Sequence, residues 1–335
     1  MTNTPKLRRP AALPLHQRYL LQASLLQGDL ALEAWQHWVT LIDFEKLDPA
    51  SYSLLGLLYQ NLQQFELEQL EHTYMPRLKG IYRRIWYVNQ LTVKRLARLL
   101  EVLDAQNVEY LVMADGSLQS DPLGQASGYR SMNSLSLLVR SVNDSGLLRV
   151  LESQGWEEDG APASRLQGFL RLCDRQDNAL QLHQQIFWER PKEAVLQQVW
   201  EDAIPGSPLG KALGRTLSPT DQFLYLSRQL SQQHQSFQLH WIADAVLLLR
   251  QNSLDWDRLI AQAQQYKLII PVRNMLVMAQ PYLTDEVPVK IGEQLSSLRV
   301  APWELIQYPI LFRETKLILR SYIARFFRDR RPKST

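Results

Sequence analysis

Two short apolar runs of this sequence carry polar side chains at every second position. Ser134 and Ser136 lie in the first run, and Gln181 and His183 lie in the second. Side chains of a β-strand point alternately to opposite faces, so each pair is expected to share one face of a strand. Hydroxyl and amide oxygens can hydrogen-bond a ligand, but unlike carboxylates they bring no negative charge to a divalent metal.

Other chemistry finds little support in the spacing of reactive residues. A serine nucleophile needs a neighbouring base, and no Gly-x-Ser-x-Gly turn is present. The histidines, at positions 16, 37, 72, 183, 234 and 240, show no zinc-ligand spacing. We interpret His183 as a buried or pocket histidine, and the single Cys173 as a small buried residue that excludes an intramolecular disulfide.

Composition indicates a folded protein in a reducing compartment. The chain has 335 residues, of which 45% are hydrophobic and 21% charged, enough for two or three structural units. No run approaches the roughly 20 apolar residues that span a bilayer, and the N-terminus lacks the apolar core of a signal peptide. We therefore expect a cytoplasmic protein. A net charge of +3 does not by itself indicate nucleic-acid binding.

Helices are expected on both sides of a small α/β unit. Leucines recur at helical spacing before residue 107, and the longest predicted helix covers 82–103. Its off-stripe cations predict a solvated face, with a phosphate-facing role as the alternative. Between residues 107 and 200 the pattern predicts four strands, 108–113, 135–139, 169–173 and 179–187, and a helix at 147–154.

The predicted fold class is therefore α+β, mostly helical, with a small mixed sheet flanked by N- and C-terminal helical regions. The predicted divisions are a disordered basic arm (1–14), a helical region (15–106), an α/β core (107–200), a Pro- and Gly-rich linker (201–216) and a helical region with a basic tail (217–335). The last helix is expected over 305–327.

The stretch 128–139 resembles the signature strand of the nucleotidyltransferase superfamily, in its branch of uncharacterised bacterial nucleotidyltransferases. That pattern reads Arg-Pro-Met-Gly-Asp-Ile-Asp-Leu-Leu-Val, and this chain keeps Arg130, Met132, Leu135 and the Leu-Leu-Val run 137–139. Similar matches lie in the long helix (82–89), at Gly116, at Gly155-Trp156, at 180–183 and in three later segments (217–221, 241–244 and 255–259). Together the resemblance covers roughly residues 50–280.

The resemblance implies a metal site whose three acids are replaced. Ser134 and Ser136 stand where the family has two Asp residues, and Gln181 stands where it has the third acid. Asp115 occupies the position of a family Lys, which adds repulsion toward a triphosphate. Two-metal catalysis needs charged oxygen ligands, so we expect no catalytic residues at this degenerate site and no bound metal. The candidate nucleotide-binding residues are Asp115, Gly116, Ser117, Arg130 and His183.

Three functions follow from these observations. The first is a catalytically inactive family member that binds a protein partner, or a nucleotide without turnover. The second is an active enzyme that uses Mg²⁺ or Mn²⁺ and a nucleoside triphosphate to modify a small molecule or protein, with a ligand relocated to Asp115, Asp121 or Asp144. The third is a basic adaptor that binds a membrane surface or RNA through Lys316–Lys333. No feature of the sequence indicates DNA.

Overall fold

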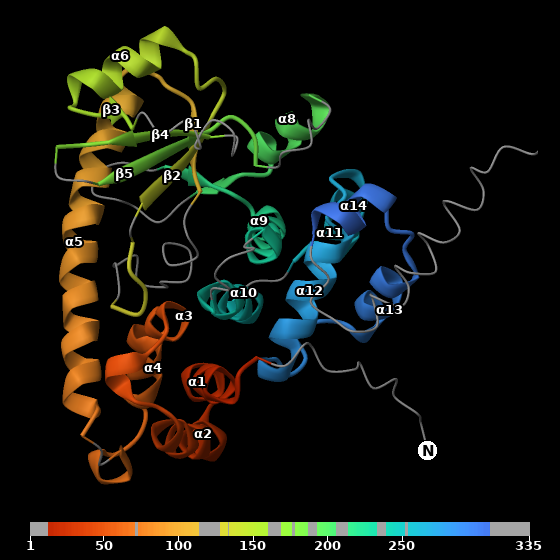
Figure 1. Ribbon diagram of the computed structural model, residues 1–335. Coiled ribbons are helices and arrows are strands. Elements are labelled where there is room, and N and C mark those ends of the chain that lie inside the picture. Colours follow the sequence, from red (N-terminus) through yellow and green to blue (C-terminus); the bar gives the residue numbers. More distant parts are fainter. Residues whose placement is uncertain are drawn as a thin grey trace, which may run out of the picture.

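The computed structural model contains a mixed sheet, and helical regions precede and follow its strands in the sequence (Figure 1). It describes residues 13–70, 73–113, 128–132, 134–159, 169–175, 178–186, 193–205, 214–232, 239–251 and 254–308. Residues 1–12 of the predicted N-terminal arm and the basic segment Lys316–Lys333 lie outside these residues, whereas Leu13 packs against the core and Pro14 precedes the first helix. No helix among them is long and apolar enough to cross a membrane.

The N-terminal helices form a small bundle against the first half of one long helix. The bundle contains α1 (Leu15–Leu25), α2 (Gly28–Leu41), α3 (Pro49–Tyr52) and α4 (Leu55–Leu62). The long helix, α5 (Met75–Ala105), has 31 residues and a Pro in its first turn, where the missing N–H costs nothing. It runs along one edge of the molecule from the bundle to the sheet (Figure 1).

The sheet has seven strands in the order β3-β4-β5-β2-β1-β7-β6. They are β1 (Tyr110–Val112), β2 (Ser134–Val139), β3 (Glu157–Glu158), β4 (Phe169–Cys173), β5 (Ala179–His183), β6 (Ile204–Pro205) and β7 (Arg215–Thr216). The pairs β2–β5 and β1–β7 are parallel and the others are antiparallel. The mixed sheet confirms the predicted fold class.

The two faces of the sheet pack against different helices. Leu135, Leu137 and Leu180 join a cluster with the C-terminal half of α5 and with α6 (Ser145–Ser153). Leu111 and Leu138 point to the other face and join the large core that also holds the N-terminal and C-terminal helices. The period-two pattern thus places the polar positions of β2 and β5 on the face toward the helical core.

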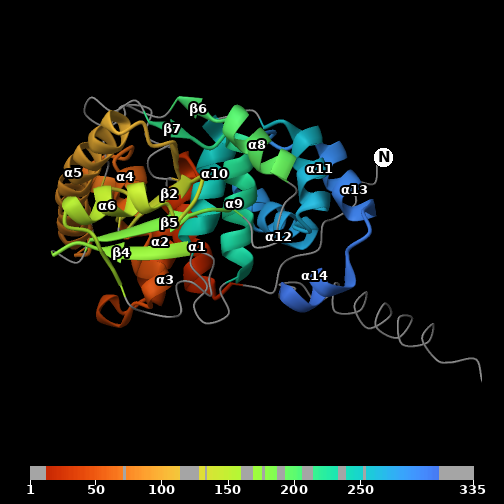
Figure 2. The ribbon, with the colours of Figure 1, turned by 90° about the horizontal axis from the view of Figure 1, so that it is seen from above.

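The C-terminal region is helical, as predicted. It contains α9 (Pro219–Gln232), α10 (His240–Gln251), α11 (Trp256–Gln265), α12 (Ile269–Ala279), α13 (Val289–Ser297) and α14 (Pro302–Gln307). Seen from above, α9 and α10 lie between the sheet and the remaining C-terminal helices (Figure 2). The bounds of the helix expected over 305–327 are wrong, because α14 begins at Pro302 and ends at Gln307, where Tyr308 has an extended backbone. Residues 309–327 lie outside the described residues.

The predicted linker at 201–216 is not purely a connection. Its two ends form β6 and β7, which pair with each other, and β7 also pairs with β1. Each strand has two residues, too few to carry a periodic signal, and the surrounding Pro and Gly residues favour a loop assignment. Before β6 the chain forms α8 (Glu193–Glu201), which the sequence analysis did not single out.

Candidate functional site

The parallel pairing of β2 with β5 brings the polar positions of the two strands into register. Ser136 lies opposite Gln181, Ser134 opposite Ala179 and Leu138 opposite His183. The Ser136 hydroxyl lies 3.5 Å from Gln181 Oε1, at the limit of a hydrogen bond. Ser136 is buried, with 5% of its surface exposed. Two neutral side chains therefore contact each other at the centre of the candidate site.

His183 lies on the same face and is held neutral. Burial lowers its pKa to about 3, and the positive charge of Arg228 on α9 acts in the same direction. Its Nε2 atom has no hydrogen-bond partner among the described residues, and the ring lies 5.2 Å from that of Phe169. The neutral imidazole of His183 and the buried guanidinium of Arg228 therefore lie on the side of the sheet that carries the Ser136–Gln181 contact.

Arg130 is held by the C-terminal helices. Its guanidinium pairs with Asp244 on α10 and lies 4.9 Å above the ring of Trp241, and both charged side chains are buried. Burial lowers the pKa of the adjacent His240 to about 2, with Arg130 acting in the same direction. In this arrangement Arg130 connects the segment before β2 to α10.

Asn89 of α5 fixes the backbone of that segment. Its Nδ2 donates to the Arg130 carbonyl oxygen at 2.6 Å, and its Oδ1 accepts from the Met132 backbone N–H at 2.9 Å. One amide side chain therefore holds both ends of a three-residue stretch, as in the ladder of a sheet. In the sequence Asn89 stands out only as part of the matched helix 82–89.

Several candidate residues lie outside the described residues. They are Asp115, Gly116 and Ser117 of the candidate nucleotide site and Asp121 of the relocated-ligand alternative. The side chain of Ser134 is also undescribed, although its backbone begins β2. Asp144 is described and caps α6, because its Oδ1 accepts from the Gly146 and Leu147 backbone N–H groups. Within the described ranges no three His, Cys, Asp or Glu residues gather as a metal site.

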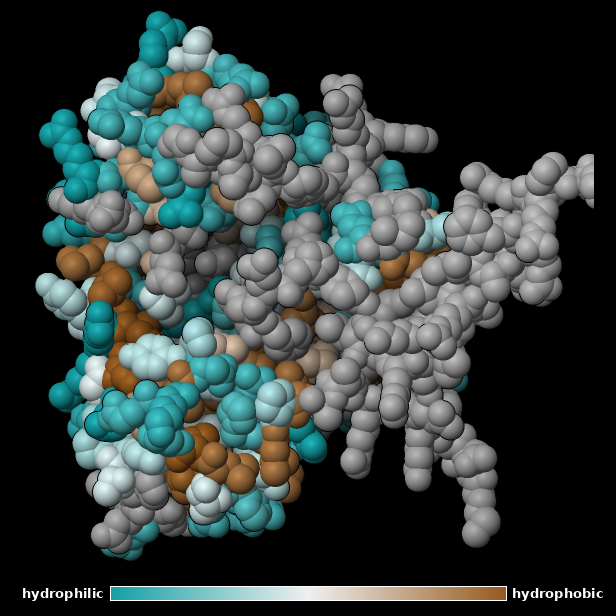
Figure 3. Space-filling view, viewed as in Figure 1, coloured by the Kyte–Doolittle hydropathy of each residue, from teal (hydrophilic) through white to brown (hydrophobic). Residues whose placement is uncertain are grey.

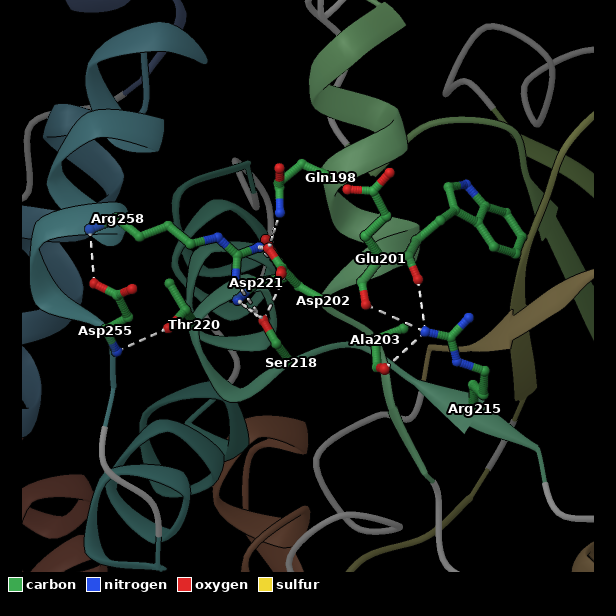
Figure 4. Close-up of polar contacts among 11 residues, drawn as sticks. Gln198, Glu201, Asp202, Ala203, Arg215, Ser218, Thr220, Asp221, Asp255 and Arg258 are labelled. Carbon is green, nitrogen blue, oxygen red and sulfur yellow. Dashed lines mark hydrogen bonds and ion pairs between the residues drawn. The ribbon is translucent and has the colours of Figure 1, made fainter.

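A second polar cluster joins the end of α8 to the C-terminal helices, and sequence reasoning missed it. Arg258 on α11 lies 2.5 Å from Asp221 and 3.2 Å from Ser218 Oγ, and 3.0 Å from Asp202 after α8 (Figure 4). Nearby, Arg215 of β7 donates to the carbonyl oxygens of Trp200 and Ala203 at 2.7 and 2.9 Å. The Ser218 hydroxyl oxygen also accepts from the Asp221 backbone N–H in the first turn of α9.

The sheet places β2 and β5 side by side with Ser136 opposite Gln181, two of the positions at which the resemblance expects metal-binding acids. The model of the uncharacterised nucleotidyltransferase family matches residues 50–284, which is more than half of the chain. The chain belongs to this family, and the resemblance seen in the sequence is confirmed.

The other comparisons add little. No curated protein matches the chain. Among solved structures the chain is similar to one described as an antigenic nucleotidyltransferase-like protein from Paracoccidioides brasiliensis. The two share 14% identity and a TM-score of 0.38, over 64% of this chain and 96% of that chain.

Proposed function

We propose that this chain is a catalytically inactive nucleotidyltransferase-family protein that acts by binding rather than by transfer. The observation that carries the proposal is the register pair Ser136–Gln181, at positions where the resemblance places two metal-binding acids. Nucleotidyl transfer needs two divalent ions whose charge is balanced by carboxylates. Neutral hydroxyl and amide oxygens cannot supply that balance.

The electrostatics of the same face support this proposal. His183 is neutral above pH 4 because its pKa lies at about 3, and the charge of Arg228 contributes to that shift. A face lined by neutral oxygens and a neutral imidazole offers no charged ligand to a divalent ion. The ligand that we propose is therefore a nucleotide held without turnover, or a protein partner that covers the face.

Thermal unfolding with nucleoside triphosphates, with and without Mg²⁺ or Mn²⁺, tests the proposal. A ligand at about 100 times its Kd stabilises the fold by about 2.7 kcal/mol, a shift of a few degrees in Tm. We expect no metal-dependent shift for the natural chain. A metal-dependent shift accompanied by release of pyrophosphate would show an active enzyme and overturn the proposal.

A restored variant makes the test sharper. In the triple variant Ser134→Asp, Ser136→Asp and Gln181→Glu, three carboxylates face one another, so Tm should fall without metal and recover with Mg²⁺. The control Ser153→Asp adds a carboxylate at an exposed serine of α6. Its Tm should neither fall in the absence of metal nor rise when Mg²⁺ is added. If the triple variant gains no metal response, the assignment of the three acid positions is wrong.

A further inference from the structure

The outer face of α5 combines an unusual excess of positive charge with exposed aromatic side chains. Residues 73–100 contain seven Lys and Arg residues and no Asp or Glu. The chain as a whole carries +3, so the rest of it has a net charge of −4. Together with the basic segment Lys316–Lys333, this helix therefore concentrates the positive charge of a chain whose other residues are on balance acidic.

The cations and apolar side chains share one side of the helix. Arg83, Tyr87 and Leu91 follow one another at a spacing of four residues, and Lys94 and Arg98 continue the same face. All five are exposed, with 60% of Tyr87 and 43% of Leu91 accessible, and Trp86 beside them is 46% exposed. The opposite face, with Leu78, Leu96 and Leu100, is buried. Figure 3 shows hydrophobic side chains between hydrophilic ones along the edge where α5 runs.

Most of these cations are available for a ligand. At the start of the helix Arg77 is paired with Glu45 at 2.5 Å. Among the described residues no acid pairs with Arg83, Arg84, Lys94 or Arg98. From Lys79 to Arg98 the helix extends about 28 Å at 1.5 Å per residue, which is long enough to follow several phosphates of one strand.

We propose that this face of α5 binds single-stranded nucleic acid, with the cations on phosphates and Tyr87 and Trp86 stacking on unpaired bases. Exposed aromatic side chains between cations are the combination that single-strand binding uses. A membrane-surface helix instead turns a continuous apolar face to the lipid. The continuous apolar face of α5 is already buried against the protein. Its outward apolar side chains form a short cluster, with cations on the turns before and after it: Trp86, Tyr87, Val88 and Leu91.

The test measures binding of a fluorescent single-stranded RNA of about 20 nucleotides to the full chain over a series of salt concentrations. The double variant Arg83→Gln/Arg84→Gln should weaken binding roughly tenfold, and its salt slope should be shallower by about 1.4, since each single-strand phosphate contact contributes about 0.7. Tyr87→Ala should weaken binding about fivefold or more through lost stacking.

Matched controls separate this surface from general charge. Arg149→Gln/Lys290→Gln removes two exposed cations from α6 and α13, and Tyr52→Ala removes an aromatic side chain that is 46% exposed. These variants should bind RNA as the natural chain does, with Tm unchanged in all variants.

Equal losses in the control and test variants, or no saturable binding at low salt, would overturn the proposal. So would vesicles of anionic phospholipid whose binding depends on Arg83 and Tyr87 while RNA binding does not, because that outcome indicates a membrane surface. None of these outcomes depends on the nucleotide response of the β2–β5 face, so the two proposals succeed or fail separately.

Discussion

Arg130 and Asp244 form an ion pair whose side chains are 8% and 2% exposed. Each buried charge of this pair is balanced by the other, and removal of one leaves the other buried without this counter-ion. Asn89 and Trp241 hold the same arginine from two other sides, through its backbone and its guanidinium. The segment that leads into β2 is therefore positioned by α5 and α10 together.

Asp244→Ala should reduce the free energy of unfolding by about 3–5 kcal/mol, because the buried guanidinium of Arg130 then loses the carboxylate of Asp244. Urea denaturation would measure this loss. The double variant Arg130→Met/Asp244→Leu removes both charges and should recover much of it. A loss from Asp244→Ala that is smaller than 1 kcal/mol would show that the pair is solvated in solution.

His183 predicts a pH dependence of stability. Its folded pKa of about 3 lies below the ordinary value of 6.5, so the unfolded chain binds the additional proton between these values. The contribution of His183 is thus fully present above pH 6.5 and is lost as the pH falls toward 3, by at most about 1.4 kcal/mol per pH unit.

The variant His183→Gln should lose less stability than the natural chain between pH 6.5 and 4, measured by chemical denaturation at each pH. The carboxylates are the same in both chains, so their contribution to the pH dependence of stability cancels in the comparison. The variant His37→Gln, at an exposed histidine, is the control. Parallel pH profiles for the natural chain and His183→Gln would mean that the imidazole is accessible to solvent.

At the scale of elements, the sequence predicted the helices and strands whose apolar residues recur with a clear period. The strand 169–173 has the predicted bounds, and the region after residue 217 is helical as expected. The two-residue strands β6 and β7 were missed because pairing across the sheet, not local pattern, creates them. The Ser136–Gln181 contact needed the register of β2 and β5, which only the resemblance suggested.

Substitutions at two helical glycines distinguish the effect of close packing on stability from the effect of helix propensity. A Cβ on Gly56 of α4 would lie 2.3 Å from the Gly128 carbonyl oxygen, whereas a Cβ on Gly80 of α5 would meet nothing within 4 Å. Gly56→Ala should therefore destabilise the protein, by about 1–3 kcal/mol, because the backbone of the segment before β2 must move. Gly80→Ala should stabilise it by up to about 1 kcal/mol. Thermal denaturation of both variants checks the opposite signs, and equal shifts would contradict the packing.

At the scale of the whole molecule, one hydrophobic core joins parts that are far apart in the sequence. It contains Leu20 and Trp38 from the first helices, Leu138 from the sheet and Phe223 and Met275 from the C-terminal helices. If the chain were divided into separate domains through this core, apolar surface would be exposed on each of them. The end of α8 and the C-terminal helices are joined in addition by the polar contacts of Arg258.

The final prediction concerns Arg258, which bridges a buried acid and a partly exposed one. Asp221 is fully buried, and burial raises its pKa although Arg258 acts to lower it. Asp202 is 29% exposed. Arg258→Gln should cost about 3–5 kcal/mol of unfolding free energy at pH 7, because the buried carboxyl of Asp221 loses its cation, whereas Asp202→Asn should cost at most about 1 kcal/mol.

The cost of Arg258→Gln should shrink as the pH falls. Without the cation the pKa of Asp221 rises further above its unfolded value, so the folded variant takes up a proton at a higher pH than the natural chain does. A carboxyl with a raised folded pKa favours folding at low pH, and the difference between the two chains is therefore smaller at pH 5 than at pH 7. Urea denaturation at both pH values measures it, and a difference independent of pH would mean that Asp221 is already protonated in the natural chain.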